Sequence, residues 1–292
     1  MLKKRRKRLD WVQVMAAVVL TAFAVVVFIP FWSSIVVSFQ TERDYALHPF
    51  ALWPNEFTLE NYAGLMDKGR LLLTAYKGSL ITTILGTLIG MTISVMGAYV
   101  FSRKFPGKRI LFGIMMLTMF FSGGMVPLYL QLKNMHLLDT YTAVIGINLI
   151  SVYNIVIMKN GFETVPMELQ DAAMIDGAND MQIFAKVMLP LQKPLIATFS
   201  LFTIVGYWNN WYWPMLVFNG GDKTVLQLFL KNVVSNLIFE QNMSSSVVVD
   251  KLTFSQGIQM ATVVVIMLPV MVVDPFLQKY FTKGIMVGAV KM

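Results

Sequence analysis

The sequence predicts an all-α membrane protein in which six helices cross the bilayer. Of its 292 residues, 56% are hydrophobic and only 14% are charged, with a mean hydropathy of +0.62. That composition is too apolar for a soluble domain of this size. Six apolar runs each approach or exceed the ~20 residues that a helix needs to cross a bilayer. Lys and Arg residues gather in alternate connections between these runs.

The apolar runs place the six spans along one domain that covers residues 1–292. We expect spans at about 11–39, 78–102, 110–131, 141–159, 194–218 and 256–277. The first run is far longer than the ~7–15 apolar residues of a signal peptide, and no A-x-A-like cleavage site follows it. It is therefore expected to be a retained helix.

Small and helix-breaking residues mark the second and third spans. Gly86, Gly90, Ser94 and Gly97 place small side chains along one side of the second span, which favours close helix packing in lipid, either within this chain or against a partner. Residues 122–124 (Ser-Gly-Gly) and Pro127 interrupt the third span. A loosened backbone is tolerated there if protein or a water-filled cavity covers it, and a simple helix end is the alternative.

The distribution of Lys and Arg predicts the orientation of the chain. Sixteen of the 24 basic residues lie on the side that holds the N-terminus, the turn 103–109, the segment after the fourth span and the C-terminus; eight lie on the other side. Because positive residues are retained in the cytoplasm, both termini are expected there. This bias accounts for the net charge of +8 without a nucleic-acid partner.

A polar cytoplasmic loop, residues 160–193, interrupts this apolar pattern between the fourth and fifth spans. Pro166 suits a first helical position, and Glu168 and Asp171 follow near the positive end of the helix dipole. Gly177 would end this helix, and Asn179 with Gln182 resembles a capping box for a second one, which we expect to end at Pro190. Two short helices joined by a glycine turn, with small side chains at Ala172, Ala173 and Ala178, have the profile of a docking element.

The fifth span carries a run of aromatic and amide side chains that is the candidate substrate path. The run comprises Tyr207, Trp208, Asn209, Asn210 and Trp211. Aromatic faces stack on the apolar faces of sugars, and amides pair with hydroxyl groups. Trp and Tyr also anchor helices at the membrane interface, so both interpretations stay open.

The sequence lacks the residues or motifs that several classes of chemistry require. There is no cysteine, which excludes disulfides and iron–sulfur clusters. His48 and His136 lie far apart in polar stretches, so we expect no metal site and no catalytic residues. No G-x-x-x-x-G-K-[ST] motif for nucleotide binding occurs. Asp274, near the cytoplasmic end of the sixth span, is the acid closest to the membrane interior and would be the candidate proton site of an ion-coupled transporter.

The polar loop carries a resemblance to a known family. Asp171-Ala172-Ala173, Gly177 and the sequence from Val187 to Pro190 match the pattern E-A-A-x3-G-x9-I-x-L-P of bacterial ABC importer permeases, with Asp in place of Glu and Val in place of Ile. Residues 125–145, 206–215 and 283–291 extend the likeness over essentially the whole chain. They resemble sugar-importer permeases of the maltose-permease type, particularly the second, shorter subunit.

The resemblance implies a type I ABC importer fold and a set of partners. The partners would be a second, homologous permease in a heterodimer, two ATPase subunits that bind ATP and Mg, an extracytoplasmic binding protein, a carbohydrate and membrane lipid of the bacterial inner membrane. It makes the loop a coupling helix that receives ATPase motion, with no cofactor in this chain. The matching residues are Glu168, Asp171, Ala172, Ala173, Asp176, Gly177, Leu189 and Pro190.

The function predicted from these features is ATP-driven sugar import by alternating access. The subunit itself is not expected to be an enzyme. The stretch NGGDKTVLQLFLKN is similar to permeases for complex or acidic oligosaccharides, of which an alginate importer is the example. An ion-coupled secondary transporter is the alternative. It would need ionisable groups at the middle of the membrane, and the six apolar runs hold none.

Overall fold

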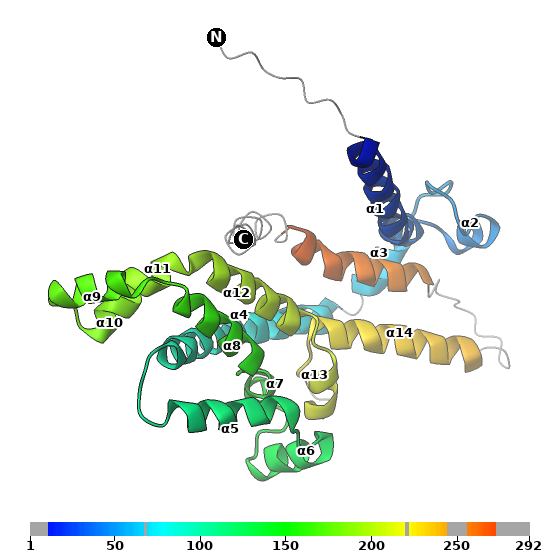
Figure 1. Ribbon diagram of the computed structural model, residues 1–292. Helices are drawn as coiled ribbons and strands as arrows, with labels where there is room; N and C mark the ends of the chain where they lie inside the picture. The colour runs from blue at the N-terminus through cyan, green and yellow to red at the C-terminus, as the bar shows by residue number, and fades with distance from the viewer. Residues whose placement is uncertain (1–10, 67–68, 220–221, 244–255, 273–292) are drawn as a thin grey trace. The chain divides into compact units, whose positions relative to one another are not determined.

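The computed structural model describes residues 11–66, 69–219, 222–243 and 256–272, and all elements in these ranges are helical (Figure 1). An isolated β-bridge between Gln40 and Phe57 is the only pairing of extended backbone in these ranges. The helices are α1 (Trp11–Ser38), α2 (Glu42–Leu47), α3 (Glu60–Met66), α4 (Gly69–Ser102), α5 (Lys108–Phe120), α6 (Met125–Asn134), α7 (Tyr141–Ile147), α8 (Val152–Glu163), α9 (Met167–Ile175), α10 (Asp180–Ile183), the π-helix η1 (Phe184–Met188), α11 (Leu189–Leu191), α12 (Lys193–Trp208), α13 (Tyr212–Val217), α14 (Leu226–Met243) and a last helix, Gln256–Val272.

The chain divides into two compact units, which we describe separately. The first comprises Met1–Lys68 and Val233–Leu268, and the second comprises Gly69–Asn232 and Pro269–Met292. The single domain expected from the sequence stays a prediction.

In the first unit, α1 is an uncharged apolar helix of the kind that crosses a membrane. It runs for 28 residues without a charged side chain, and its most apolar stretch buries no side chain within the protein. Trp11, Val18, Phe23 and Phe28 are among its many exposed apolar residues. A helix that is apolar on all sides and unpartnered is stable only where hydrocarbon surrounds it, so α1 coincides with the first predicted span.

After α1, the first unit folds its polar loop around the carboxylate of Asp44. Its Oδ2 accepts hydrogen bonds from the Asn55 backbone N–H at 2.9 Å and from Gln40 Nε2 at 3.1 Å, and Oδ1 accepts from Asn55 Nδ2 at 3.0 Å. Burial raises the pKa of Asp44, but the hydrogen bonds from Asn55, Glu56 and Gln40 outweigh it and hold the pKa below its usual range. The segment that follows α1 is therefore an ordered structure.

In the second unit, α4 is the central helix and packs against α7, α8 and α12. It begins at Gly69 rather than at the predicted position 78, because the apolar window that marks a membrane crossing does not mark the end of a helix. Glycines permit the close packing. A Cβ on Gly86 would lie 2.4 Å from the Tyr207 ring, and one on Gly90 would lie 2.6 Å from the Leu149 carbonyl oxygen. The small residues of the second span thus pack within this chain.

Two apolar clusters form the core of the second unit. One joins α4, α8, α12 and the connection between the last two, and it includes Tyr99, Met158, Phe162, Ile183 and Met188. The other joins α6, α7, α13 and the start of α14, and it includes Leu132, Val144, Val217, Phe218 and Leu228. The polar loop therefore contributes buried side chains to the first cluster.

The structure breaks three of the predicted spans. The third consists of α5 and α6, bent by 111°, because residues 121–124 leave the helix and Gly124 adopts φ +87°. The fourth is bent by 53° between α7 and α8, where Ser151 caps α8 with its side chain. The helix of the fifth span stops at Trp208, and α13 follows after Asn209, Asn210 and Trp211. The interruption predicted within the span 110–131 is confirmed, whereas the breaks within the spans 141–159 and 194–218 were not predicted.

Over the residues that the structure describes, two helices, α1 and α4, are each long and apolar enough to cross a membrane. The number rises to five if each of three bent helix pairs is taken as one span. The helix Gln256–Val272 covers most of the sixth predicted span, whose last residues, with Asp274, lie outside the described residues. Six spans and cytoplasmic termini stay predictions.

Candidate functional site

The polar segment of residues 166–190 folds as two short helices with a glycine turn, as predicted. Helix α9 ends at Ile175, and Gly177 adopts φ +82°, a conformation that side chains with a Cβ disfavour. Asn179 accepts a hydrogen bond from the Gln182 backbone N–H at 2.9 Å, and the Gln182 side chain accepts one from the Asn179 N–H at 2.9 Å. This is the predicted capping box, and it begins α10.

The two prolines of the segment lie differently from the prediction. Pro166 is the N-cap of α9 rather than its first residue. Helix α10 does not end at Pro190 but continues through the π-helix η1 and α11 to Leu191. Pro190 has no N–H to donate, and the i→i+5 pattern of η1 precedes it directly. A bend of 79° then separates this stretch from α12.

The inner face of the segment packs on the ends of α4 and α8. Ile183 and Met188 are buried against Tyr99 of α4 and Phe162 of α8. Further contacts come from half-buried side chains of the same cluster, namely Ala173, Ala178, Phe184, Val187 and Leu189. Two of the predicted docking residues, Ala173 and Leu189, thus pack inward, so the segment is attached firmly to the body of the unit.

Arg103, at the end of α4, fastens both helices of the segment. Its guanidinium donates to the buried Gln170 side chain of α9 and forms an ion pair with Asp180 of α10 at 2.8 Å. The same guanidinium lies 5.6 Å from the centre of the Tyr99 ring. Arg103 therefore joins α9 and α10 to the end of α4.

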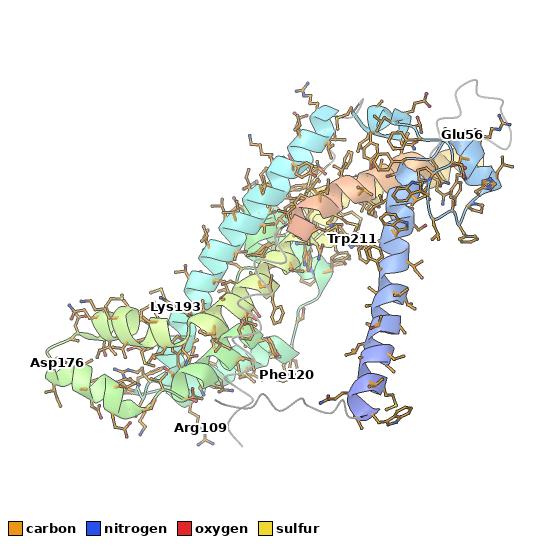
Figure 2. The ribbon with its side chains drawn as sticks, turned by 90° about the horizontal axis from the view of Figure 1, so that it is seen from above. Glu56, Arg109, Phe120, Asp176, Lys193 and Trp211 are labelled. Atoms are coloured by element: carbon orange, nitrogen blue, oxygen red, sulfur yellow. The ribbon has the colours of Figure 1, made fainter. Side chains whose placement is uncertain are left out.

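The outer face of the segment is free for another surface. Glu168, Asp171, Ala172, Asp176 and Gly177 are all exposed, and none of the three acids forms an ion pair within the described ranges. Ile175 is 86% exposed, with Met181 also exposed beyond the turn. Figure 2 shows Asp176 at the far tip of the segment, where α9 and α10 meet. An exposed tip that combines acids with apolar side chains is suited to insertion into a complementary cleft.

The first two residues of the aromatic run are buried within the unit. Tyr207 lies against Gly86 and donates its hydroxyl hydrogen to the Ile145 carbonyl at 2.9 Å. Trp208 is 8% exposed. Tyr207 is therefore fully engaged in joining α12 to α4 and α7, and it is the member of the predicted path least suited to contact a substrate.

The last three residues of the run lie where the helix has broken, next to α14. Asn209 Oδ1 accepts a hydrogen bond from Gln227 Nε2 at 3.3 Å, and Lys231 Nζ lies 5.5 Å from the centre of the exposed Trp211 ring. Lys231 takes part in none of the ion pairs found in the described part of the chain. Asn210 has a buried amide nitrogen without a partner. An aromatic face, amides and a cation thus lie near one another at the break in the helix.

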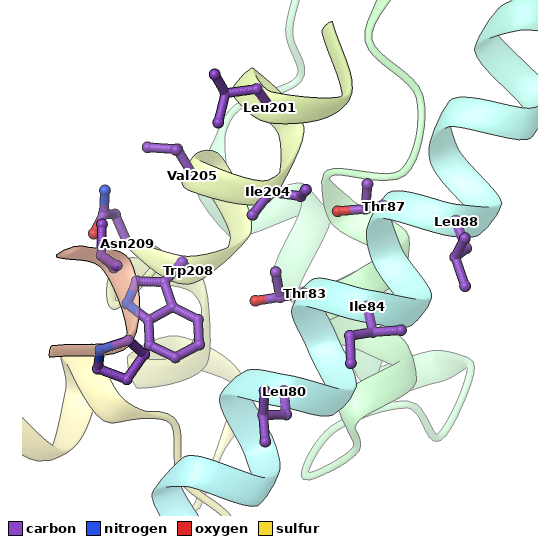
Figure 3. Close-up of a pocket in the computed structure, with 12 residues that line it drawn as sticks. Leu80, Thr83, Ile84, Thr87, Leu88, Leu201, Ile204, Val205, Trp208 and Asn209 are labelled. Carbon is purple, nitrogen blue, oxygen red and sulfur yellow. The ribbon is translucent and has the colours of Figure 1, made fainter. Parts of the chain in front are cut away.

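A cavity of about 360 Å³ lies in the second unit between α4 and α12 (Figure 3). Its lining is mainly apolar, but Thr83, Thr87 and Trp208 each carry a buried polar atom without a hydrogen-bond partner. Figure 3 shows the two threonines on the side of α4 that faces α12. Unpaired buried hydroxyl and N–H groups are costly unless water or a ligand satisfies them. This cavity adjoins Asn209, so it extends the candidate path.

The sequence did not single out Arg103, Thr83, Thr87, Gln227 or Lys231 as site residues. A signal existed for the last four, because each pair, 83 with 87 and 227 with 231, is spaced by four residues and therefore shares one face of a helix. Nothing in the sequence indicated which helix these faces would meet. Among the described residues, no group of three or more His, Cys, Asp or Glu side chains could hold a metal ion.

Comparison with known proteins identifies similar chains over nearly the full length. The sequence profile of the family described as "Binding-protein-dependent transport system inner membrane component" matches residues 86–287. Protein LplC of Bacillus subtilis (strain 168) is 37% identical over 90% of this chain and 89% of its own length. The polygalacturonan/rhamnogalacturonan transport system permease protein YtcP of the same organism is 37% identical over 93% and 95%.

A solved structure shares the fold. A chain in the crystal structure of a bacterial ABC transporter involved in the import of the acidic polysaccharide alginate superposes with a TM-score of 0.81. The two chains are 28% identical, and the match covers 96% of this chain and 99% of that one. The architecture seen here is thus that of a permease chain in a solved transporter.

Proposed function

The chain belongs to the family of binding-protein-dependent transport system inner membrane components, and from this premise we propose that it imports an acidic oligosaccharide in an ATP-driven complex. It is a multi-pass protein of the inner membrane and the permease component of a sugar ABC transporter. The finer points of mechanism and substrate rest on the geometry of the 166–190 segment and of the path beside α12.

The observation that carries the coupling role is the build of the 166–190 segment. Its inner face is packed on α4 and α8 and fastened by Arg103, whereas its outer face is exposed. A partner that moves Asp176 and Gly177 would therefore move the ends of both helices. The energy would come from two separate ATPase subunits that bind ATP and Mg, since this chain has no motif for a nucleotide.

Alternating access follows from that coupling. Closure of the ATPase dimer would favour one of two conformations of the permease. The segment would couple the two, because its contacts with the ATPase would be more favourable in that conformation. We expect a second, homologous permease to complete the path, and an extracytoplasmic binding protein to deliver the sugar. The chain itself would make and break no covalent bond.

The proposed substrate class rests on the arrangement around Lys231. Polygalacturonan and alginate, named for two similar proteins, are both polymers of sugar acids, so each repeating unit carries a carboxylate. Lys231 lies beside the Trp211 ring, which could stack on a sugar face while the ammonium group binds the carboxylate. Asn209 and Asn210 would supply hydrogen bonds to hydroxyl groups, and Thr83, Thr87 and Trp208 would continue the polar lining.

Uptake measurements would test this assignment. The complex, purified with its partners and reconstituted in liposomes, would be given its binding protein and either an oligogalacturonate or an uncharged oligosaccharide of equal length. Lys231→Met should raise the apparent KM for the acidic sugar roughly tenfold, the scale of one lost charge-assisted hydrogen bond. Lys231→Arg should retain most of the wild-type uptake.

Equal KM values for Lys231→Met and wild type would contradict the substrate proposal and leave the coupling role untouched. A wild-type complex that carries the uncharged sugar as well as the acidic one would contradict it too. Loss of uptake in proportion to the amount of complex in the membrane would show that Lys231 has only a structural role.

A further inference from the structure

A basic pocket lies at the turn between α4 and α5, away from both the aromatic run and the tip of the 166–190 segment. It is an open pocket of about 930 Å³, lined by Lys104, Lys108, Arg109 and Lys159 together with Phe112 and the backbone at Gly107. All of these residues belong to the second unit. Four cations around one hollow repel each other unless an anion is present.

Among the described residues, Glu163 is the one carboxylate that pairs with these four cations. Glu163 pairs with Lys159 at 2.6 Å and with Lys108 at 3.4 Å. Burial raises the pKa of Glu163, but the hydrogen bonds and charges of Lys159 and Lys108 outweigh it, so the net pKa is lowered and the group is ionised at neutral pH. Lys104 and Arg109 are exposed and form no ion pair among the described residues. The pocket therefore retains an excess of positive charge.

The backbone adds to this positive potential. Helix α5 begins at Lys108, and its N-cap is Gly107 at φ +79°, with no side-chain hydrogen bond to the first turn. The N-terminus of a helix carries partial positive charge and is normally stabilised by acids. Here Lys108 and Arg109 occupy the first turn instead, and an anion held at this point would be favoured by the side chains and the helix together.

One side of α5 packs against α8, and the rest of the helix is apolar and exposed. No residue of this helix is buried, and Ile110, Leu111, Ile114, Leu117 and Phe120 are all more than half exposed. Figure 2 labels Arg109 near the basic end of the helix and Phe120 at its apolar end. A ligand with an anionic head and hydrocarbon tails would match the pocket and the helix surface beyond it. A free phosphate would match only the pocket.

We propose that the pocket formed by Lys104, Lys108, Arg109 and Lys159 binds the headgroup of an anionic phospholipid whose acyl chains lie along α5. The positive-inside bias places this turn at the cytoplasmic leaflet, where anionic lipids attract basic clusters and basic pockets between helices hold their headgroups. The bound lipid would brace the α4–α5 turn, which directly follows Arg103. The proposal does not depend on the sugar that is carried.

Lipid titration would test the site. The delipidated complex in detergent would be titrated with fluorescent phosphatidylglycerol and, separately, with phosphatidylcholine bearing the same acyl chains. Wild type should bind phosphatidylglycerol more tightly. Lys104→Gln with Arg109→Gln should weaken phosphatidylglycerol binding roughly tenfold or more, because each cation near an anionic lipid contributes ~1 kcal/mol, or about fivefold. Both residues are exposed, so folding should be unaffected.

The control is Arg70→Gln with Lys77→Gln, which removes the same two charges from exposed positions near the other end of α4. It should leave phosphatidylglycerol binding unchanged, and Lys104→Arg with Arg109→Lys should preserve it. Equal loss in the two Gln pairs, or equal binding of the two lipids by wild type, would overturn the proposal. Displacement of phosphatidylglycerol by millimolar glycerol phosphate alone would assign the pocket to a soluble anion instead.

Discussion

The contact between Gly86 and Tyr207 shows how single residues fix the distance between α4 and α12. The Tyr207 ring occupies the place where a side chain on Gly86 would begin. Its hydroxyl group is tied to Ile145. An aromatic residue that is predicted to bind sugar is thereby committed to holding three helices together. The neighbouring residues that remain available, Trp208 to Trp211, lie beyond this contact along the chain.

Gly86→Ala should destabilise the protein by about 1–3 kcal/mol, because the new methyl group would overlap the ring in a well-packed interface. The matched control is Gly206→Ala in α12, next to Tyr207, where an added Cβ meets nothing within 4 Å. That variant should be neutral or slightly more stable, since Ala favours helix. Thermal unfolding in detergent would compare the two, and equal midpoints would contradict the contact.

Asp44 gives the loop of the first unit a dependence on pH. Its pKa is lowered in the folded protein, so its contribution to stability is complete above the unfolded value of 3.8 and is lost as the pH falls through the folded pKa. We expect the protection of amides against exchange over residues 40–57, corrected for the intrinsic rate at each pH, to fall below about pH 4. Asp44→Asn should remove most of this dependence. Equal protection at pH 6 and pH 3 in wild type would refute it.

Among the elements, the 166–190 segment is stabilised by contacts of its inner face with the rest of the unit. Its helices are short, and isolated helices of that length are not stable in water. They persist because Ile183 and Met188 enter the cluster with Tyr99 and Phe162, and because Arg103 satisfies the buried Gln170. The segment can therefore act as a rigid extension of α4 and α8.

Arg103→Gln should loosen this segment without unfolding the unit. Loss of the guanidinium leaves the buried amide of Gln170 without its partner, at a cost of about 1 kcal/mol, whereas the exposed pair with Asp180 adds little. Amide exchange in α9 and α10 should accelerate roughly fivefold. Lys104→Gln removes the same charge one residue away. Lys104 forms none of the ion pairs found among the described residues, so this variant should have no effect on the segment. Equal amide exchange in Arg103→Gln and Lys104→Gln would show that Arg103 does not stabilise α9 and α10.

The elements differ in how far the sequence could predict them. The helices α9 and α10 and their capping box follow from local signals at Gly177, Asn179 and Gln182, and α1 follows from its unbroken apolar run. Residues 122–124 and Pro127 also indicated the break in the third span. The bends within the fourth and fifth spans could not be predicted, because hydropathy measures only whether a window is apolar. The partners of Gly86, Arg103 and Trp211 also lay beyond prediction, since each lies far along the chain and depends on how α4, α9, α12 and α14 pack.

At the scale of the whole molecule, the family and the fold are those of transporter permeases. On the proposed function, α4 and α12 with their cavity line part of the path of the sugar, and the exposed tip at Gly177 receives movement from a partner. We therefore expect a separate ATPase that contacts the tip.

Purification of the tagged chain from its native membrane in mild detergent, followed by measurement of ATP hydrolysis, tests this expectation most directly. Wild type should retain an ATPase. Gly177→Asp should lose most of that activity, because a charge appears at the docking tip. Two controls isolate the cause: Gly177→Asn tolerates the same positive φ without the charge, and Gly69→Asp adds the charge at an open position at the start of α4. Both should retain more activity than Gly177→Asp. A wild-type chain that purifies alone and hydrolyses no ATP, or full hydrolysis and transport by Gly177→Asp, would contradict the account.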